Sequence, residues 1–142
     1  NNAQLAARMG WVAEGNFGDQ DLAWFGSLPA PLAPAALAAK LEAVLGRPAL
    51  CLDDGQARPI RRIGWCSGGA QGYFEQAIAL GLDAYVSGEV SEQTTHLARE
   101  SGVTYFACGH HATECLGVAA LADHLSTAFG LDCQFVDIAN PV

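Results

Sequence analysis

Residues 105–114 have the sequence YFACGHHATE and join an apolar, strand-like run to the start of a helix. The apolar periodicity of residues 116–125 predicts that this helix continues well past the quoted stretch. His110 and Glu114 are then four residues apart, which places an imidazole nitrogen and a carboxylate on the same helical face. His111 points about 100° away from that face and needs a different role.

The spacing of His110 and Glu114 predicts that they are two ligands of a divalent metal site. Borderline and hard divalent cations accept this combination of imidazole and carboxylate donors. The position also favours a ligand site, because open α/β sheets bind their ligands beyond the carboxyl ends of the strands. The alternative is a surface ion pair or a capping arrangement, which is the commoner origin of a His/Glu pair at helical spacing.

The same combination of strand, glycine-containing turn and helix occurs three times after residue 60. Strands are expected at 61–66, 84–87 and 103–108, and the turns that follow them are Ser67–Gly72, Gly88–Glu92 and Gly109–Glu114. Strands that alternate with helices predict an α/β fold with a largely parallel or mixed sheet and right-handed crossovers. The three turns then converge on one edge of the sheet. A last strand is expected at Cys133–Asp137.

The first sixty residues predict a less regular arrangement. A helix is expected at 1–8, a strand, a turn and a second strand within 11–26, a helix at 35–45 and a short strand at 49–52. The prolines at 29, 31 and 34 predict a stiff connector between the second strand and the helix. We expect residues 1–142 to form a single α/β unit.

Polar side chains are concentrated at the edge where the three turns meet. They are Glu89, Glu92, His96, His110, His111 and Glu114. Glu89 is a candidate catalytic residue, as a general base for a metal-bound water, or a hydrogen-bond partner of a metal ligand. The alternative is a helix N-terminal carboxylate that the helix dipole stabilises. Glu92 and His96 are expected to form an ordinary ion pair or to support a ligand, and His124 is expected to be structural. The amides of 67–72 either bind an anion or form a tight turn.

The composition limits the classes of partner. Of the 142 residues, 51% are hydrophobic and 15% charged, and the net charge is -8 with only seven Lys and Arg, so nucleic acid is not an expected partner. There is no apolar run of transmembrane length and no signal-peptide pattern. We therefore expect no membrane partner, and we expect a cytoplasmic location. The five cysteines are odd in number and lack a C-x-x-C motif, which favours reduced, mostly buried thiols, Cys66 and Cys108 included.

Four segments together resemble a known family. They are WCSGG at 65–69, GEVSEQTTH at 88–96, GHHATE at 109–114 and DIANP at 137–141. They are similar to the NIF-three-like dinuclear-metal-centre family, whose members are often labelled GTP cyclohydrolase 1 type 2 homologues. The GHHATE segment is the most specific, and the likeness extends over the whole chain as the later part of a longer protein.

The resemblance implies a two-domain α/β subunit, a toroidal homohexamer and two divalent ions per full-length subunit, of iron, zinc, manganese, nickel or cobalt. By motif match it implies that His110 and Glu114 are metal ligands. It implies that the remaining ligands, a His pair and an Asp, belong to an N-terminal part outside this chain, so that this chain alone is expected to bind metal weakly or not at all. The implied function is a metal-dependent hydrolase acting on a nucleotide or related small molecule. The alternative is a non-enzymatic metal-binding scaffold or regulatory protein that acts as a ring-shaped homo-oligomer.

Overall fold

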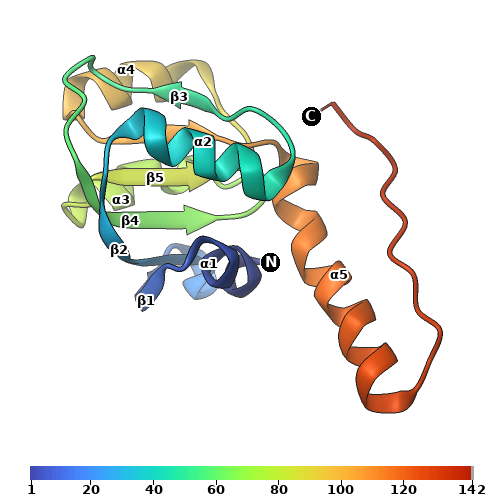
Figure 1. The fold of residues 1–142 in the computed structure, drawn as a ribbon. Helices are drawn as coiled ribbons and strands as arrows, with labels where there is room; N and C mark the ends of the chain where they lie inside the picture. The colour runs from blue at the N-terminus through green and yellow to red at the C-terminus, as the bar shows by residue number, and fades with distance from the viewer. Residues whose placement is uncertain (142) are drawn as a thin grey trace.

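The computed structural model describes residues 1–141, which form one six-stranded mixed sheet in the order β1-β2-β4-β5-β6-β3 (Figure 1). The strands are β1 (Val12–Phe17), β2 (Ala23–Leu32), β3 (Leu50–Leu52), β4 (Ile60–Cys66), β5 (Ala84–Ser87) and β6 (Thr104–Ala107). The helices are α1 (Asn2–Met9), α2 (Pro34–Leu45), α3 (Phe74–Ala79), α4 (Glu92–Ser101) and α5 (His110–Phe129), with short 3₁₀ turns η1 (Asp19–Asp21) and η2 (Gln71–Tyr73). The α/β fold with a mixed sheet is confirmed.

The parallel strands β4, β5 and β6 are the centre of the molecule. Cys66 pairs with Ser87, and Ser87 pairs with Ala107, so the three strands end at the same level. Every residue of β5 and β6 is buried, as expected for parallel strands that are covered on both faces. The turns that follow the three strands therefore meet at one edge of the sheet, as the sequence predicts.

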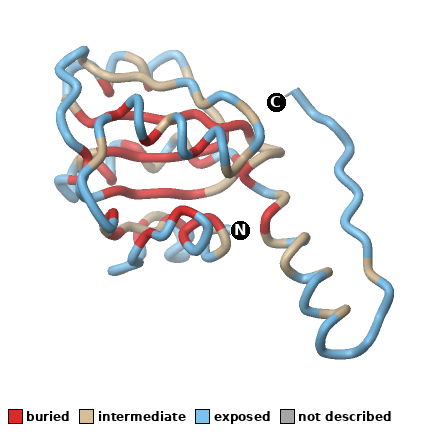
Figure 2. Tube along the Cα trace, viewed as in Figure 1, coloured by how far each residue is buried: buried red, intermediate tan, exposed pale blue. Residues whose placement is uncertain are grey.

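Helices cover both faces of the sheet (Figures 1 and 2). Along β5 and β6, Val86 and Phe106 point into the core that α1 and α2 cover, while Tyr85 and Tyr105 point into the core beneath α3 and α4. Trp65 is fully buried in the first core, 5.1 Å from the Trp11 ring. This packing on two faces fixes the strand ends that carry the polar turns.

Antiparallel strands extend the sheet at both edges. β1 pairs with β2, β2 with β4, and β3 with β6. The proline connector predicted after residue 26 is wrong, because β2 continues through Pro29 and Pro31 to Leu32. The strand tolerates both prolines because they follow Ser27, the last residue of β2 that pairs with β1, and because the pairing with β4 shifts in register between Ser27 and Leu32.

The second half of α5 and the residues after it extend away from the sheet (Figure 1). The predicted strand Cys133–Asp137 is wrong: residues 130–141 follow α5 back toward the sheet as an irregular segment. Its apolar residues favour a strand locally, but an isolated strand needs a partner, and residues 130–141 pair with none of the six strands. Phe135, Val136 and Ile138 are consequently exposed.

The five cysteines are all free thiols, and Cys66 and Cys108 are buried, as predicted; the expectation of mostly buried thiols is wrong for the other three, which are half-buried. Burial raises the pKa of Cys108 to about 12, so its thiol stays protonated at neutral pH. None of the helices within residues 1–141 combines the length and the apolar character that crossing a membrane requires.

Candidate metal centre

Three glycine turns contact one another through their backbones at the carboxyl ends of β4, β5 and β6. The amide of Gly88 donates to the carbonyl oxygen of Gly68 at 2.9 Å, and the amide of Gly109 donates to the carbonyl oxygen of Gly88 at 2.8 Å. Thr113 on α5 accepts from the amide of Gly68 at 2.9 Å and donates back to the carbonyl oxygen of Gly109 at 2.9 Å. The first turn of α5 is therefore locked against the turns that follow β4 and β5.

His110 lies between two carboxylates at this junction. Its Nδ1 is 2.7 Å from Oε1 of Glu89, and its Nε2 is 3.3 Å from Oε2 of Glu114, one helical turn further along α5. The three side chains are 37–44% exposed, so they face solvent. The structure thus brings together the two predicted metal ligands and the predicted catalytic residue Glu89.

Glu89 is held by further contacts. Its Oε2 accepts a hydrogen bond from Nε2 of Gln71 at 3.1 Å, and its carbonyl oxygen accepts from the hydroxyl of Tyr105. The hydrogen bond from His110, followed by that from Gln71, lowers the pKa of Glu89. The same contact with Glu89, reinforced by Glu114, raises the pKa of His110. Nδ1 makes the shorter of the two carboxylate contacts, so we assign the proton of neutral His110 to Nδ1, which leaves the lone pair on Nε2, facing Glu114.

Glycines leave the space in which these side chains meet. A Cβ atom on Gly68 would lie 2.5 Å from Oε1 of Glu114 and 3.2 Å from Nε2 of His110, and one on Gly69 would lie 3.2 Å from Oε1 of Glu89. Gly68 also has a φ of +69°, a conformation that L side chains rarely adopt. The donor set, the free Nε2 lone pair and the space that Gly68 leaves all fit a divalent cation held by His110 and Glu114.

The other predicted residues lie outside this group. Glu92 and His96 are exposed on α4, and within residues 1–141 no ion pair involves either of them. His124 is exposed far along α5, with its ring 6.3 Å from that of Phe129. These three residues are not part of the site that the structure assembles.

The amides of the turn at 67–72 are used within the protein, which favours the tight-turn alternative over an anion site. Ser67 donates to Oδ1 of Asn2 at 2.9 Å, and Ala70 donates to Oγ of Ser87 at 3.2 Å. With the amide of Gly68 bonded to Thr113, three donors of this turn already have side-chain partners.

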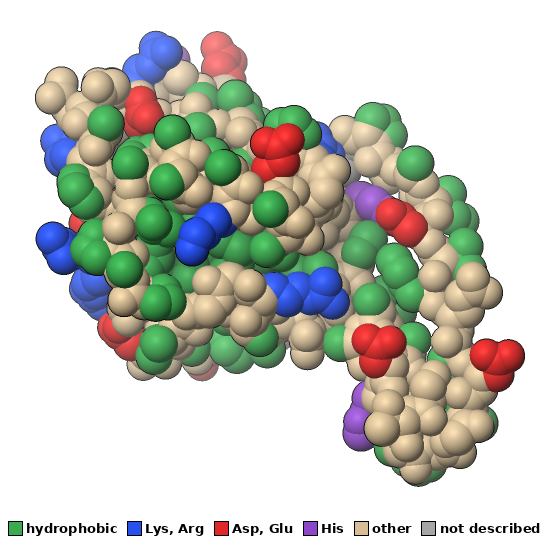
Figure 3. Space-filling view, in the orientation of Figure 1, with side chains coloured by type: hydrophobic (Ala, Val, Ile, Leu, Met, Phe, Trp, Pro, Cys, Tyr) green, Lys and Arg blue, Asp and Glu red, His purple; other side chains and the backbone are tan. Residues whose placement is uncertain are grey.

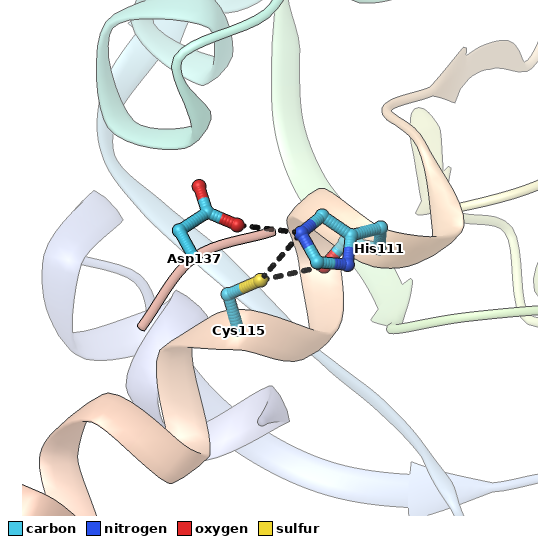
Figure 4. Close-up of side chains that lie close together, drawn as sticks. All are labelled: His111, Cys115 and Asp137. Atoms are coloured by element: carbon cyan, nitrogen blue, oxygen red, sulfur yellow. Dashed lines mark hydrogen bonds and ion pairs between the residues drawn. The ribbon is translucent and has the colours of Figure 1, made fainter. Parts of the chain in front are cut away.

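A second polar group lies on the neighbouring face of α5. Nε2 of His111 is 2.8 Å from Oδ1 of Asp137 and 3.4 Å from Sγ of Cys115 (Figure 4). This group was not predicted from the sequence, although His111 and Cys115 are four residues apart and therefore share a helical face. Both groups border a cavity of about 470 Å³, lined by His110, His111, Glu114, Cys115, Val118, Phe135 and Asn140.

A sequence model of the family described as Duf34/NIF3 (NGG1p interacting factor 3) matches residues 1–141. The chain belongs to the Duf34/NIF3 family. Among its Duf34/NIF3 relatives, proteins of Pseudomonas aeruginosa and Allochromatium vinosum, both named GTP cyclohydrolase 1 type 2 homolog, are 51% and 49% identical over 99% of this chain. The chain spans 56% of the length of each of these two relatives.

A solved structure of the same fold is that of protein ybgI, described as of unknown function. It superposes with a TM-score of 0.93 at 43% identity, covering 99% of this chain and 56% of that one. The predicted resemblance to the NIF-three-like family is confirmed by these comparisons, and the mixed α/β fold agrees with a solved structure.

Proposed function

We propose that this Duf34/NIF3 chain forms part of a divalent-metal-binding protein that acts as a metal-dependent hydrolase on a nucleotide or related small molecule. The observation that supports this best is the convergence of His110 Nε2 and Glu114 Oε2 at 3.3 Å, with the other imidazole nitrogen held by Glu89. Imidazoles that bind metals usually donate their second N–H to a carboxylate in this way.

His110 and Glu114 would hold the cation through Nε2 and a carboxylate oxygen. Divalent ions bound there would act as Lewis acids on a substrate oxygen and on water. Two residues are fewer than the three protein ligands usual for catalytic zinc. This chain covers 56% of the length of its relatives, so we propose that other regions of the full-length protein complete a site for two ions.

Glu89 is better suited to positioning than to proton transfer. Oε1 of Glu89 is engaged by His110 and Oε2 by Gln71, which fixes the carboxylate and with it the imidazole. By holding the proton on Nδ1, Glu89 keeps the lone pair of Nε2 available and directed toward Glu114.

Glu89→Gln is expected to weaken divalent metal binding about 10–100-fold, the usual cost of losing a ligand's hydrogen-bonded carboxylate. Isothermal titration of the full-length gene product with Zn²⁺ or Mn²⁺ measures the change. The matched control is Glu92→Gln, which neutralises an exposed carboxylate on α4 and leaves the affinity unchanged. Equal affinities for the Glu89→Gln and wild-type proteins would contradict the positioning role.

A substrate screen tests the hydrolase itself. Metal-loaded full-length protein is incubated with nucleotides, cyclic nucleotides and phosphomonoesters, with His110→Ala as the control. Hydrolysis that disappears in the variant supports the enzyme. Full metal loading without any turnover would rule out the hydrolase for the compounds tested and favour the second candidate.

The second candidate is a non-enzymatic scaffold or regulator that acts as a ring-shaped homo-oligomer. The observation in its favour is the apolar surface of α5 and the segment after it (Figure 3). Its exposed hydrophobic residues are Val118, Leu121, Phe129, Leu131, Phe135, Val136 and Ile138. Monomeric proteins rarely expose so many apolar side chains together, so we propose that another subunit covers this surface. Native mass spectrometry of the preparation used in the screen gives the subunit number.

A further inference from the structure

His111, Cys115 and Asp137 present three different donor atoms to one point. His111 and Cys115 lie one turn apart on α5, and Asp137 comes from the segment that runs back along the helix (Figure 4). The imidazole nitrogen, the thiol sulfur and the carboxylate oxygen all lie within 4.8 Å of one another. The convergence therefore joins two segments that are separated by more than twenty positions in the sequence.

The distances are close to those of a tetrahedral zinc site. Zinc–ligand bonds of about 2.0–2.3 Å place two tetrahedral ligands roughly 3.3 Å apart for N and O, and roughly 3.6 Å apart for N and S. In the structure, Nε2 of His111 is 2.8 Å from Oδ1 of Asp137 and 3.4 Å from Sγ of Cys115. A cation needs each of these two pairs to separate by a few tenths of an ångström, and Sγ of Cys115 and a carboxylate oxygen of Asp137 lie within 4.8 Å of each other, with Asp137 on an irregular segment.

Hydrogen bonding within the protein does not join all three donor atoms to one another. When Nε2 of His111 carries a proton and donates to Asp137, it has no lone pair left for the thiol of Cys115. The thiol instead points to the carbonyl oxygen of His111, at 3.1 Å. A cation would bond to the nitrogen, the sulfur and the oxygen at the same time, and the adjoining cavity of about 470 Å³ has room for a water as fourth ligand.

We propose that His111, Cys115 and Asp137 bind one divalent cation of the zinc type, separate from the site of His110 and Glu114. Imidazole, thiolate and carboxylate are the three ligand types that zinc takes from proteins. The two sites share no ligand atom, so each binds its ion without needing the other. The bound ion cross-links the C-terminal segment to the first turns of α5.

Cobalt(II) titration of the full-length gene product tests this site, because only a thiolate ligand gives the sulfur-to-cobalt charge-transfer absorption in the near ultraviolet. The titration is made in the His110→Ala/Glu114→Ala background, so that failure of the proposed hydrolase site leaves the result unaffected. The expected result is one cobalt per subunit with this absorption, displaced by one equivalent of Zn²⁺. Absence of the absorption in this background would overturn the proposal.

Cys115→Ser identifies the thiol and is a mild change at a half-buried position. It is expected to abolish the charge-transfer band, and Asp137→Asn to weaken cobalt binding about tenfold or more. Cys133→Ser is the matched control, since it removes a half-buried thiol from the same segment and leaves the band intact. A band that persists in Cys115→Ser, or that disappears in Cys133→Ser, would overturn the assignment.

Discussion

His110→Ala and Glu114→Ala are each expected to lower the affinity of the His110–Glu114 site for divalent metal by at least about 100-fold, and the double variant to lose that ion altogether. Removal of either residue takes away one of the two donors that this chain supplies to the site, and each lost ligand must be replaced by water. Isothermal titration and elemental analysis of the full-length gene product measure the change, with Cys115→Ser present to remove the ion proposed at His111, Cys115 and Asp137.

The matched control for this pair is His124→Ala. It removes an exposed imidazole from the same helix, remote from the strand ends, and the metal affinity is expected to stay within a factor of about two. Exposed side chains at the start of α5 contribute little to the core, so all variants are expected to fold. Circular dichroism checks this. Stoichiometric metal of wild-type affinity in the double variant would contradict the assignment of these ligands.

Gly88→Ala is expected to destabilise the protein by about 3 kcal/mol and to weaken metal binding at the same time. A Cβ atom on Gly88 would lie 2.7 Å from the carbonyl oxygen of Gly68, 2.7 Å from Cα of His110 and 2.9 Å from Oγ1 of Thr113. The first two are backbone atoms, so neither can move aside without shifting a turn. The shift would separate α5 from the turn that follows β4, and with it His110 from Glu89.

Thermal and urea unfolding of Gly88→Ala measure the stability change, and the titration used above measures the metal. Gly72→Ala is the matched control, because nothing lies within 4 Å of a Cβ atom there and its φ is not in the left-handed region. Its unfolding free energy is expected to change by no more than about 0.5 kcal/mol. Equal stabilities for the two variants would show that the three turns are not packed as tightly as described.

The sequence predicted the centre of the fold because the signals there are local. Each of β4, β5 and β6 is an apolar run that ends in a glycine turn before a helix, and parallel strands of one sheet must end on the same side. His110 and Glu114 were brought together by helical spacing alone. Glu89 was placed near them by the same reasoning, although its bond to Nδ1 depends on β5 being the neighbour of β6.

The features that the sequence did not predict correctly all depend on contacts between distant parts of the chain. Residues 133–137 have the composition of a strand but pair with no strand of the sheet, so their local preference was not decisive. Pro29 and Pro31 are tolerated in β2 only because regular pairing is interrupted there. Asp137 lies beside His111 and Cys115, although it is twenty-six and twenty-two positions away from them in the sequence. No local sequence pattern predicts such a contact.

Anomalous diffraction from crystals of the full-length gene product grown with Mn²⁺ or Zn²⁺ shows whether His110 and Glu114 bind a metal ion. We predict an anomalous peak about 2.0–2.2 Å from both Nε2 of His110 and a carboxylate oxygen of Glu114, with Glu89 still bonded to Nδ1. A fully loaded protein whose ions all lie elsewhere, with Nε2 of His110 bonded only to protein or water, would contradict it.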